Sequence, residues 1–367
     1  MIPTVSPPAT VSPAESGQPP GPSVAAHATN VVPAASRRRG LALGLVGLVV
    51  VLLAVSLLAI GVGARPVGLG DVLEALRHHQ PGNSDHQVVI NRIPRLLVGL
   101  LVGVALGLAG TIMQAVTRNP LADPGLLGVN AGAAFAIVCA ISFAGITTAF
   151  GYIWFGFAGA LAVAVLVYAI GSAGGGGATP IKIALAGAAV QAAMQSVTTA
   201  VLLTDAETFD QYRFWTVGSL AGRRAELVAQ LAPFIAAAAL PALFVGRLLN
   251  TLVLDDDVAR GLGQRVGLTQ AGVSGLAVML CAAATSLAGP IGFIGLLAPH
   301  LARPITGPDH RWILPYAALI GATLVLASDV VGRVVARPGE VQVGVALAFL
   351  GAPFLIAIVR RQRMAQT

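Results

Sequence analysis

The sequence predicts an all-α, polytopic membrane protein, and three of its properties support this fold class. Charged residues make up only 10% of the 367 residues, whereas soluble domains carry about 25% because their surfaces face water. Hydrophobic residues make up 56% of the chain, and the mean hydropathy is +0.83. Apolar runs of near-spanning length recur along most of the chain. These properties exclude a water-soluble enzyme, a disordered protein and a secreted disulfide scaffold.

Residues 1–36 are expected to form a disordered tail ahead of a membrane domain at 37–367. The tail holds eight prolines and a single charged residue, so it cannot bury an apolar core. It does not have the pattern of a signal peptide, because no basic start is followed directly by an apolar run. The arginine cluster at 37–39 precedes the first apolar run, which predicts a cytoplasmic N-terminus.

Ten apolar segments follow, each close to the length that crosses a bilayer as a helix. The expected spans are 41–63, 94–116, 126–145, 149–171, 181–203, 228–248, 268–288, 291–306, 312–333 and 341–360. A second basic cluster at 360–363 ends the chain. An even number of crossings puts both clusters, and therefore both termini, in the cytoplasm.

Glycines in the second span predict close helix packing. Gly99, Gly103 and Gly107 fall four residues apart, and Gly110 follows them. Such a strip of small residues lets a neighbouring backbone approach, which is how helices pack in lipid.

Basic residues are distributed over the loops with only a weak inside bias. This topology places 13 Lys and Arg residues inside and nine outside. The outside residues are Arg65, Arg77, Arg92, Arg95, Arg213, Arg223, Arg224, Arg333 and Arg337. Two interpretations stay open: later loops tolerate outward basic residues, or the outer surface receives an acidic partner.

Intramembrane charge is scarce, which disfavours an ion-coupled carrier. Asp329 is the only acid well inside a span, and Arg333 follows it at the spacing of a helical ion pair. Gln114 and Gln191 could line a pathway or could equally bond helix to helix. The Gly-rich stretch at 172–180 is a connector, because no Gly-Lys-Ser/Thr follows it. ATP hydrolysis therefore has to come from another subunit.

The loop at 248–268 predicts a short helix on the cytoplasmic side. Three aspartates at 255–257 precede a short apolar turn, and Gly263 offers a helix stop. This helix could lie along the membrane surface or bind a cytoplasmic partner. The histidines at 78, 79 and 86 lack helical metal-ligand spacing and are interpreted as a solvated loop, so no metal site is expected.

A series of ordered motifs resembles the FecCD/BtuC-type permeases of ABC importers for ferric siderophores, haem and vitamin B12. The motifs are Arg92-Ile-Pro-Arg95, Arg118-Asn-Pro-Leu-Ala-Asp-Pro124, Leu185-Ala-Gly187, Trp215-Thr-Val-Gly-Ser-Leu220, Gly289-Pro-Ile-Gly-Phe-Ile-Gly-Leu-Leu-Ala-Pro-His300-Leu-Ala-Arg303, Gly307-Pro-Asp-His-Arg311 and Gly351-Ala-Pro-Phe354. The resemblance covers about residues 40–363.

The resemblance implies a ten-helix, type II ABC importer permease that catalyses no reaction itself. It implies two cytoplasmic ATPase subunits that carry the ATP and Mg, an external binding protein, and a second permease that is a copy or a similar chain. It implies no cofactor on this chain and no nucleic acid, only membrane lipid around it. The cargo it implies is an iron(III)-siderophore, with haem or vitamin B12 as the alternative.

The resemblance also assigns roles to residues of this sequence. The residues that would receive the binding protein are Arg92, Arg95 and Arg333. The residues that would couple to the ATPase are Leu254, Asp256, Ala259, Leu262 and Gly263. The family's cytoplasmic gate would fall at Thr179, Pro180 and Ile181. The sequence departs from the family at Asp255 and Gly261, where glycine and a larger residue are usual, and it matches the gate poorly.

Overall fold

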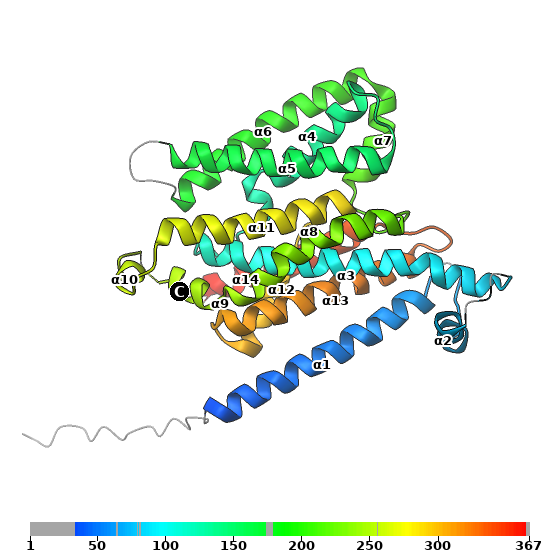
Figure 1. Ribbon diagram of the computed structural model, residues 1–367, viewed down its shortest axis with the longest axis horizontal. Helices are drawn as coiled ribbons and strands as arrows, with labels where there is room; N and C mark the ends of the chain where they lie inside the picture. Colours follow the sequence, from blue (N-terminus) through cyan, green and yellow to red (C-terminus); the bar gives the residue numbers. More distant parts are fainter. Residues whose placement is uncertain are drawn as a thin grey trace, which may run out of the picture. The chain divides into compact units, whose positions relative to one another are not determined.

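The computed structural model describes residues 34–63, 65–78, 80, 82–173, 179–254 and 256–364. Every element in these ranges is a helix, which confirms the all-α fold class (Figure 1). The elements are α1 (Ala34–Gly61), α2 (Leu69–Arg77), α3 (Ser84–Val116), the 3₁₀ helix η1 (Pro124–Leu127), α4 (Val129–Ser142), α5 (Ala149–Ser172), α6 (Pro180–Thr204), α7 (Ala206–Thr216), α8 (Ala225–Phe244), α9 (Gly246–Leu252), α10 (Asp256–Gly261), α11 (Val266–Ala288), α12 (Ile294–Thr306), α13 (His310–Val335) and α14 (Val343–Met364).

The chain divides into two units, residues 1–40 and 41–367. Of the first unit, the structure describes residues 34–40, which form the start of α1. The tail expected at 1–36 lies almost wholly outside the described residues. The second unit carries the remaining helices and both candidate sites.

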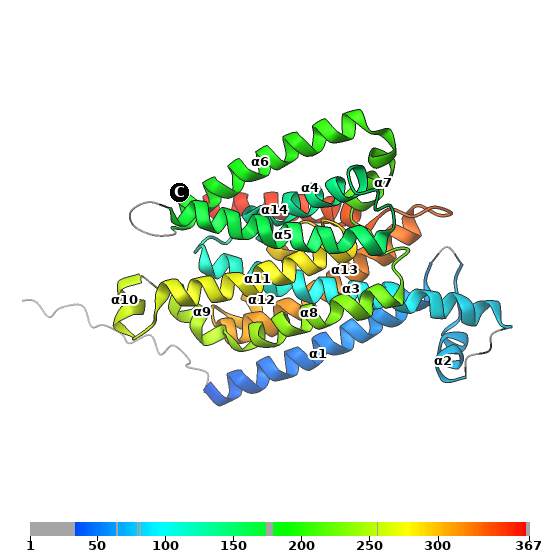
Figure 2. The same ribbon diagram turned by 45° about the horizontal axis from the view of Figure 1, so that its top comes forward.

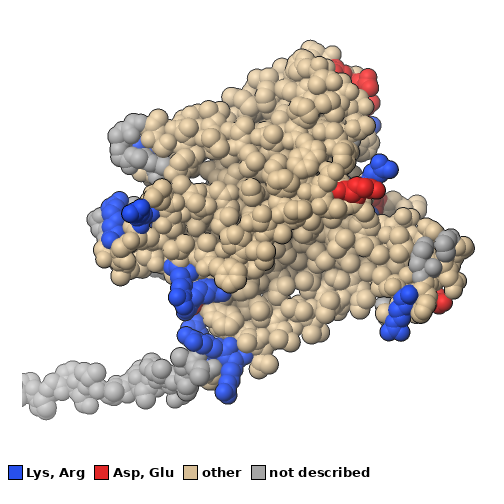
Figure 3. Space-filling model, viewed as in Figure 1, with Lys and Arg blue, Asp and Glu red and all other residues tan. Residues whose placement is uncertain are grey.

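The ten expected spans coincide with ten of the described helices. Seven of these helices are long and apolar enough to cross a membrane, namely α1, α3, α5, α6, α8, α11 and α13. The other three are shorter: α4, α12, and the apolar part of α14 at residues 343–357. On the face shown in Figure 3, charged side chains gather near the helix ends and the surface between them is uncharged.

The observed helix starts differ from the expected boundaries by up to ten residues, and local backbone features explain the starts of α3 and α4. Helix α3 begins at Ser84 rather than at 94, because the Asn83 side chain caps it by accepting from the Asp85 backbone N at 2.9 Å. Pro94 therefore lies inside α3 rather than in its first turn. Helix α4 begins at Val129 rather than 126, because η1 ends at Gly128 with a positive φ of 72°.

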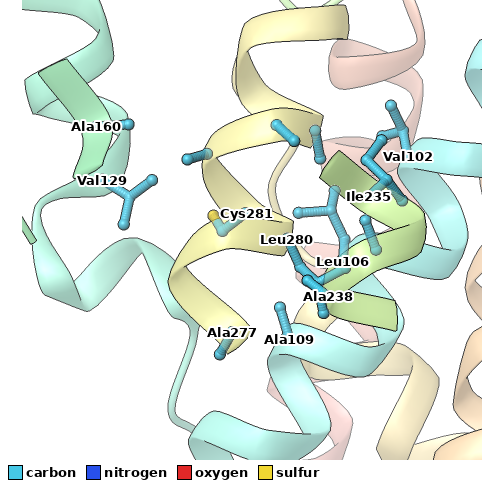
Figure 4. Packing of buried hydrophobic residues seen from close by; sticks show 14 of the residues in the cluster. Val102, Leu106, Ala109, Val129, Ala160, Ile235, Ala238, Ala277, Leu280 and Cys281 are labelled. Carbon is cyan, nitrogen blue, oxygen red and sulfur yellow. The ribbon is translucent and has the colours of Figure 1, made fainter. Parts of the chain in front are cut away.

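The apolar core is centred on three neighbouring helices. Figure 4 shows Val102 and Leu106 of α3, Ile235 of α8 and Leu280 of α11 converging, and all four side chains are buried. Helices α4 and α5 pack on the far side of α11, where they contribute Val129 and Ala160. This packing fixes α3 and α11 at the centre of the bundle.

The predicted glycine strip of α3 packs against α13 and α12 backbone to backbone. A Cβ added at Gly103 would overlap the Ala322 backbone, and one at Gly107 would overlap the Ala317 carbonyl. A Cβ at Gly110 would overlap the Gly295 carbonyl of α12. Only glycine lets these backbones approach so closely, which confirms the packing interpretation.

Helix α6 lies at the edge of the bundle (Figures 1 and 2), and both α6 and α14 expose apolar side chains. Ile181 and Leu203, near the two ends of α6, are 74% and 82% exposed, and Phe349 of α14 is 77% exposed.

Candidate functional site

The predicted outer arginines meet at one end of α3 and α13. The Arg95 guanidinium donates through Nε and Nη2 to both oxygens of Asp329, at 2.7 to 3.1 Å. Its Nη1 donates to Oε2 of Glu340 at 2.8 Å. Arg333 Nη2 pairs with Asp329 Oδ2 at 3.0 Å, which confirms the ion pair expected from their spacing. One buried carboxylate thus orients two guanidinium groups.

Arg92 and Arg333 also hold the end of α1. Arg333 Nη1 donates to the carbonyls of Ala59 and Val62 at 2.9 and 2.7 Å. Arg92 Nη1 donates to the carbonyls of Ile60 and Gly61 at 2.5 and 3.1 Å. The carbonyls of Ala59, Ile60 and Gly61 belong to the last turn of α1 and lack intrahelical donors, and that of Val62 follows directly, so the two arginines cap the helix.

Accessibility differs sharply within this outer arginine cluster, which we define as Arg92, Arg95, Arg333, Asp329 and Glu340. The Asp329 and Arg333 side chains are 2% and 4% exposed, whereas those of Arg95 and Glu340 are 17% and 38% exposed. A cavity of about 250 Å³ opens beside Arg333 and is lined in part by Glu340. The cluster holds three cations and two carboxylates, so it keeps a positive excess that suits an acidic side chain.

The predicted cytoplasmic helix is present as α10, and a second short helix, α9, precedes it. Gly263 lies two residues beyond the end of α10 and has a φ of 82°, a conformation that favours glycine. Leu254 and Leu262 are 44% and 67% exposed, as a contact surface requires. Ala259 is fully buried within the chain, so it supports α10 from inside.

Helix α9 is attached to the first turn of α13 by a polar contact that the sequence did not reveal. The Asn250 Nδ2 donates to Asp309 Oδ1 at 2.8 Å, and its Oδ1 accepts from the His310 backbone N at 2.8 Å. Asp309 caps α13 by accepting from the Arg311 backbone N at 3.0 Å, and it also accepts from the Arg311 guanidinium. The hydrogen bonds from Arg311 lower the pKa of Asp309 to about 2. A helix-capping Asp after Gly-Pro was a visible signal in the sequence, but its partner 59 residues away was not.

The candidate pathway residues do not gather in one place. Gln114 is buried, donates to the Gly295 carbonyl at 3.2 Å and accepts from Arg303 Nη2 at 2.6 Å, so it bonds helix to helix. Gln191 is exposed on α6. Thr179 caps α6 by accepting from the Lys182 backbone N at 3.4 Å, and Pro180 is its first residue. The connector at 174–178 lies outside the described residues.

A profile of the FecCD transport family matches residues 49–361 of the chain. The chain belongs to the FecCD family. Its helices carry the expected motifs in order, and the predicted resemblance is thereby confirmed.

Relatives in the FecCD family are permease proteins of iron and cobalamin transport systems. The chain is 45% identical to the ferric enterobactin transport system permease protein FepD of Escherichia coli over 324 residues, or 88% of this chain and 96% of that protein. It is 43% identical to a probable siderophore transport system permease protein, YfiZ, of Bacillus subtilis over 76% of this chain and 84% of that protein.

A solved structure shares the fold. It is described as an inward-facing conformation of a metal-chelate type ABC transporter, and it matches with a TM-score of 0.76 and 26% identity. The match covers 89% of this chain and 99% of the other. The described part of this FecCD chain holds no group of three His, Cys, Asp or Glu side chains that could bind a metal ion.

Proposed function

We propose that this FecCD chain is the permease subunit of an ATP-driven ABC importer that carries an iron(III)-siderophore across the cytoplasmic membrane. The observation that carries the proposal is the 45% identity to a ferric enterobactin permease over nearly the whole length of both chains. Relatives named for hemin and cobalamin transport match at 36% identity over about three quarters of this chain. These make haem and vitamin B12 the alternative cargo.

The outer arginine cluster is the proposed receptor for an acidic external binding protein. Arg92 and Arg95 supply the partly exposed guanidinium groups, and Asp329 holds Arg95 in a fixed orientation. Arg333 is buried against α1 and contributes through the cavity beside it. Guanidinium forks capture carboxylates in a bidentate manner, so the cluster suits this partner.

The α10 region is the proposed contact for a cytoplasmic ATPase subunit, which carries the ATP and Mg. Leu254 and Leu262 present exposed apolar side chains there, and an apolar patch at a polar boundary marks a protein contact. No phosphate-binding loop occurs in the sequence. Both chain termini would lie on this cytoplasmic side.

The exposed faces of α6 and α14 are the proposed contact with a second permease. A hollow of about 540 Å³ runs along α14 and is lined by residues such as Val345 and Phe349. Gln191 on α6 and Ile181 near the gate would then face the pathway between the two permeases. An ion-coupled carrier acting alone is disfavoured, because Asp329 is already engaged by two arginines.

Reconstitution tests the proposal directly. Proteoliposomes with this chain, its ATPase and the binding protein should accumulate radiolabelled iron(III)-enterobactin only when ATP is supplied on the ATPase side. The chain alone under a proton or sodium gradient should accumulate nothing. Gradient-driven uptake by the lone chain contradicts the proposal. ATP-driven accumulation of haemin or cobalamin, with none of iron(III)-enterobactin, would instead support the alternative cargo.

A further inference from the structure

The two proposed partner surfaces are built on the same pair of helices. At the outer end, Arg95 of α3 pairs with Asp329 of α13. At the inner end, α9 packs against both α3 and α13. Helices α3, α9 and α13 are far apart in the chain, so only the tertiary structure shows that the two surfaces share one support.

Asn250 joins α9 to α13 through one amide that uses both of its polar atoms. The Nδ2 donates to Asp309 and the Oδ1 accepts from the backbone N of His310, each at 2.8 Å. His310 Nδ1 also lies 2.9 Å from the same Oδ1. A side chain with only donors or only acceptors cannot reproduce this pattern.

Backbone packing at the start of α9 reinforces the contact. A Cβ at Gly246 would come within 2.7 Å of the Arg311 backbone N, so α9 and α13 touch without an intervening side chain. At the other end of α9, Arg118 Nε donates to the Leu252 carbonyl at 2.9 Å. Arg118 lies two residues beyond the end of α3 and follows Thr117, the C-cap of that helix. Helix α9 is therefore held at one end by α13 and at the other by the end of α3.

Helices α3 and α13 cannot easily slide past each other. Their contact at Gly103 and Gly107 is backbone to backbone, so no flexible side chain can absorb a displacement. A movement imposed on α9 would consequently shift both helices together. Packed interfaces of this kind change between discrete arrangements rather than deforming continuously.

We propose that Asn250 is a positioning residue that fastens the ATPase-facing loop to the α3–α13 pair, which also carries the outer arginine cluster. One rigid body then links the inner and outer partner surfaces. The proposal rests on the proposed function, since it presupposes that the ATPase and the binding protein contact these two surfaces.

The sharpest test is Asn250→Asp in the complete transporter in nanodiscs. This change places a second carboxylate opposite Asp309 and removes the amide donor, so the contact between α9 and α13 is lost. We expect stimulation of ATP hydrolysis by the purified binding protein to fall about five- to tenfold, within the usual range of coupling between sites. Association with the ATPase should stay within about twofold, because Leu254 and Leu262 are untouched.

Two controls separate positioning from a general effect. Thr251→Asp adds the same charge one residue along, where the native hydroxyl donates only within α9, to the Arg247 carbonyl at 3.1 Å. It should leave the stimulation unchanged. Combining Asn250→Asp with Asp309→Asn exchanges the carboxylate and the amide across the contact. The exchange keeps a donor opposite an acceptor and a capping side chain on α13, so stimulation should recover.

The outcomes distinguish a failure of the positioning role of Asn250 from a failure of the proposed function. Full stimulation in Asn250→Asp, or an equal loss in Thr251→Asp, overturns the proposal, and so does a failure of the exchanged pair to recover. Asn250→Ala removes both the amide donor and the carbonyl acceptor without adding charge, and it replaces Asn250→Asp if that variant does not fold. An unaltered transporter whose ATPase does not respond to the binding protein would contradict the proposed function instead.

Discussion

At the residue scale, Arg95 is the side chain on which the outer cluster depends. Asp329 holds it from the buried side and Glu340 from the exposed side. An exposed ion pair contributes little, typically below about 1 kcal/mol, because water and salt screen it. The bond to Glu340 is therefore the one that an incoming carboxylate can replace.

Changing Glu340→Gln should strengthen docking of the binding protein. The substitution removes the carboxylate that competes for Arg95 Nη1, so the association constant should rise about three- to tenfold at low salt. Surface plasmon resonance on the nanodisc-embedded chain measures this. Glu226→Gln, at an exposed carboxylate in the first turn of α8, removes the same charge without touching Arg95 and should change much less. Weaker binding of the binding protein to Glu340→Gln would contradict the idea that Glu340 competes with an incoming carboxylate for Arg95.

The Asp309 carboxylate gives the inner contact a defined pH dependence. Because the folded-state pKa is lowered to about 2 from an ordinary value of 3.8, the ionised form is favoured by folding. Its stabilising contribution is fully present above about pH 5. It disappears as the pH falls toward 2. The melting-temperature difference between the native chain and Asp309→Asn should be constant from pH 8 to 5 and should shrink below pH 4. A difference that grows on acidification would contradict this assignment.

At the element scale, the glycine strip of α3 decides how closely α13 and α12 approach. Gly110→Ala should destabilise the chain, because the new Cβ would overlap the Gly295 carbonyl. Overpacking of this kind costs about 1–3 kcal/mol. Gly275→Ala in α11 is the matched control, since nothing lies within 4 Å of its Cβ position, and alanine there favours the helix. Thermal unfolding in detergent compares the two, and equal melting temperatures would contradict the close approach.

The exposed side of α10 should decide binding of the ATPase. Leu262→Asp places a charge at a residue that is 67% exposed in this chain and that a partner would bury. Burying an unpaired charge costs several kcal/mol, so association should fall at least about tenfold. Leu262→Met keeps the apolar volume and should bind normally. Pull-down with the tagged ATPase measures both. Ala259 is unsuitable for this test, because it is buried inside the chain.

Hydrophobic length predicted the helices well, but it could not predict their polar extensions. The ten spans follow from apolar runs, because the backbone N–H and C=O groups of such a run find their hydrogen-bond partners in lipid by forming a helix. The start of α3 at Ser84 was missed, because six of its first ten residues are polar and the helix begins at the Asn83 cap. The start of α4 depended on the left-handed Gly128, which hydropathy does not register.

The sites were predictable where their residues are close in sequence. The Asp329–Arg333 pair follows from helical spacing. The contacts of Arg95 with Asp329 and of Asn250 with Asp309 join residues far apart in the chain, and only the packing of α3 and α9 on α13 brings them together. Burial of Ala259 was also invisible in the sequence, because it depends on the packing around α10.

At the scale of the whole molecule, the proposed contact with a second permease lies on the exposed face of α6. A single cysteine at Leu203, which is 82% exposed on α6, should form disulfide-linked dimers in oxidised membranes. The background replaces the two native cysteines, Cys139 and Cys281. A cysteine at Leu43, which is 72% exposed on α1, is the control and should remain monomeric. Cross-linking at Leu43 alone would move the interface away from α6.

The length of α3 has a further consequence for the membrane around the transporter. Its 33 residues extend about 50 Å at 1.5 Å per residue, while the hydrocarbon layer is about 30 Å thick. Arg95 lies 21 residues before Val116, so about 30 Å separates them along the helix axis. When the inner end of α3 lies at one hydrocarbon boundary, Arg95 lies at the other. Acyl-chain length therefore determines where Arg95 lies relative to the hydrocarbon boundary. A thicker bilayer would bury its guanidinium group among the acyl chains, and a thinner one would expose the group to water.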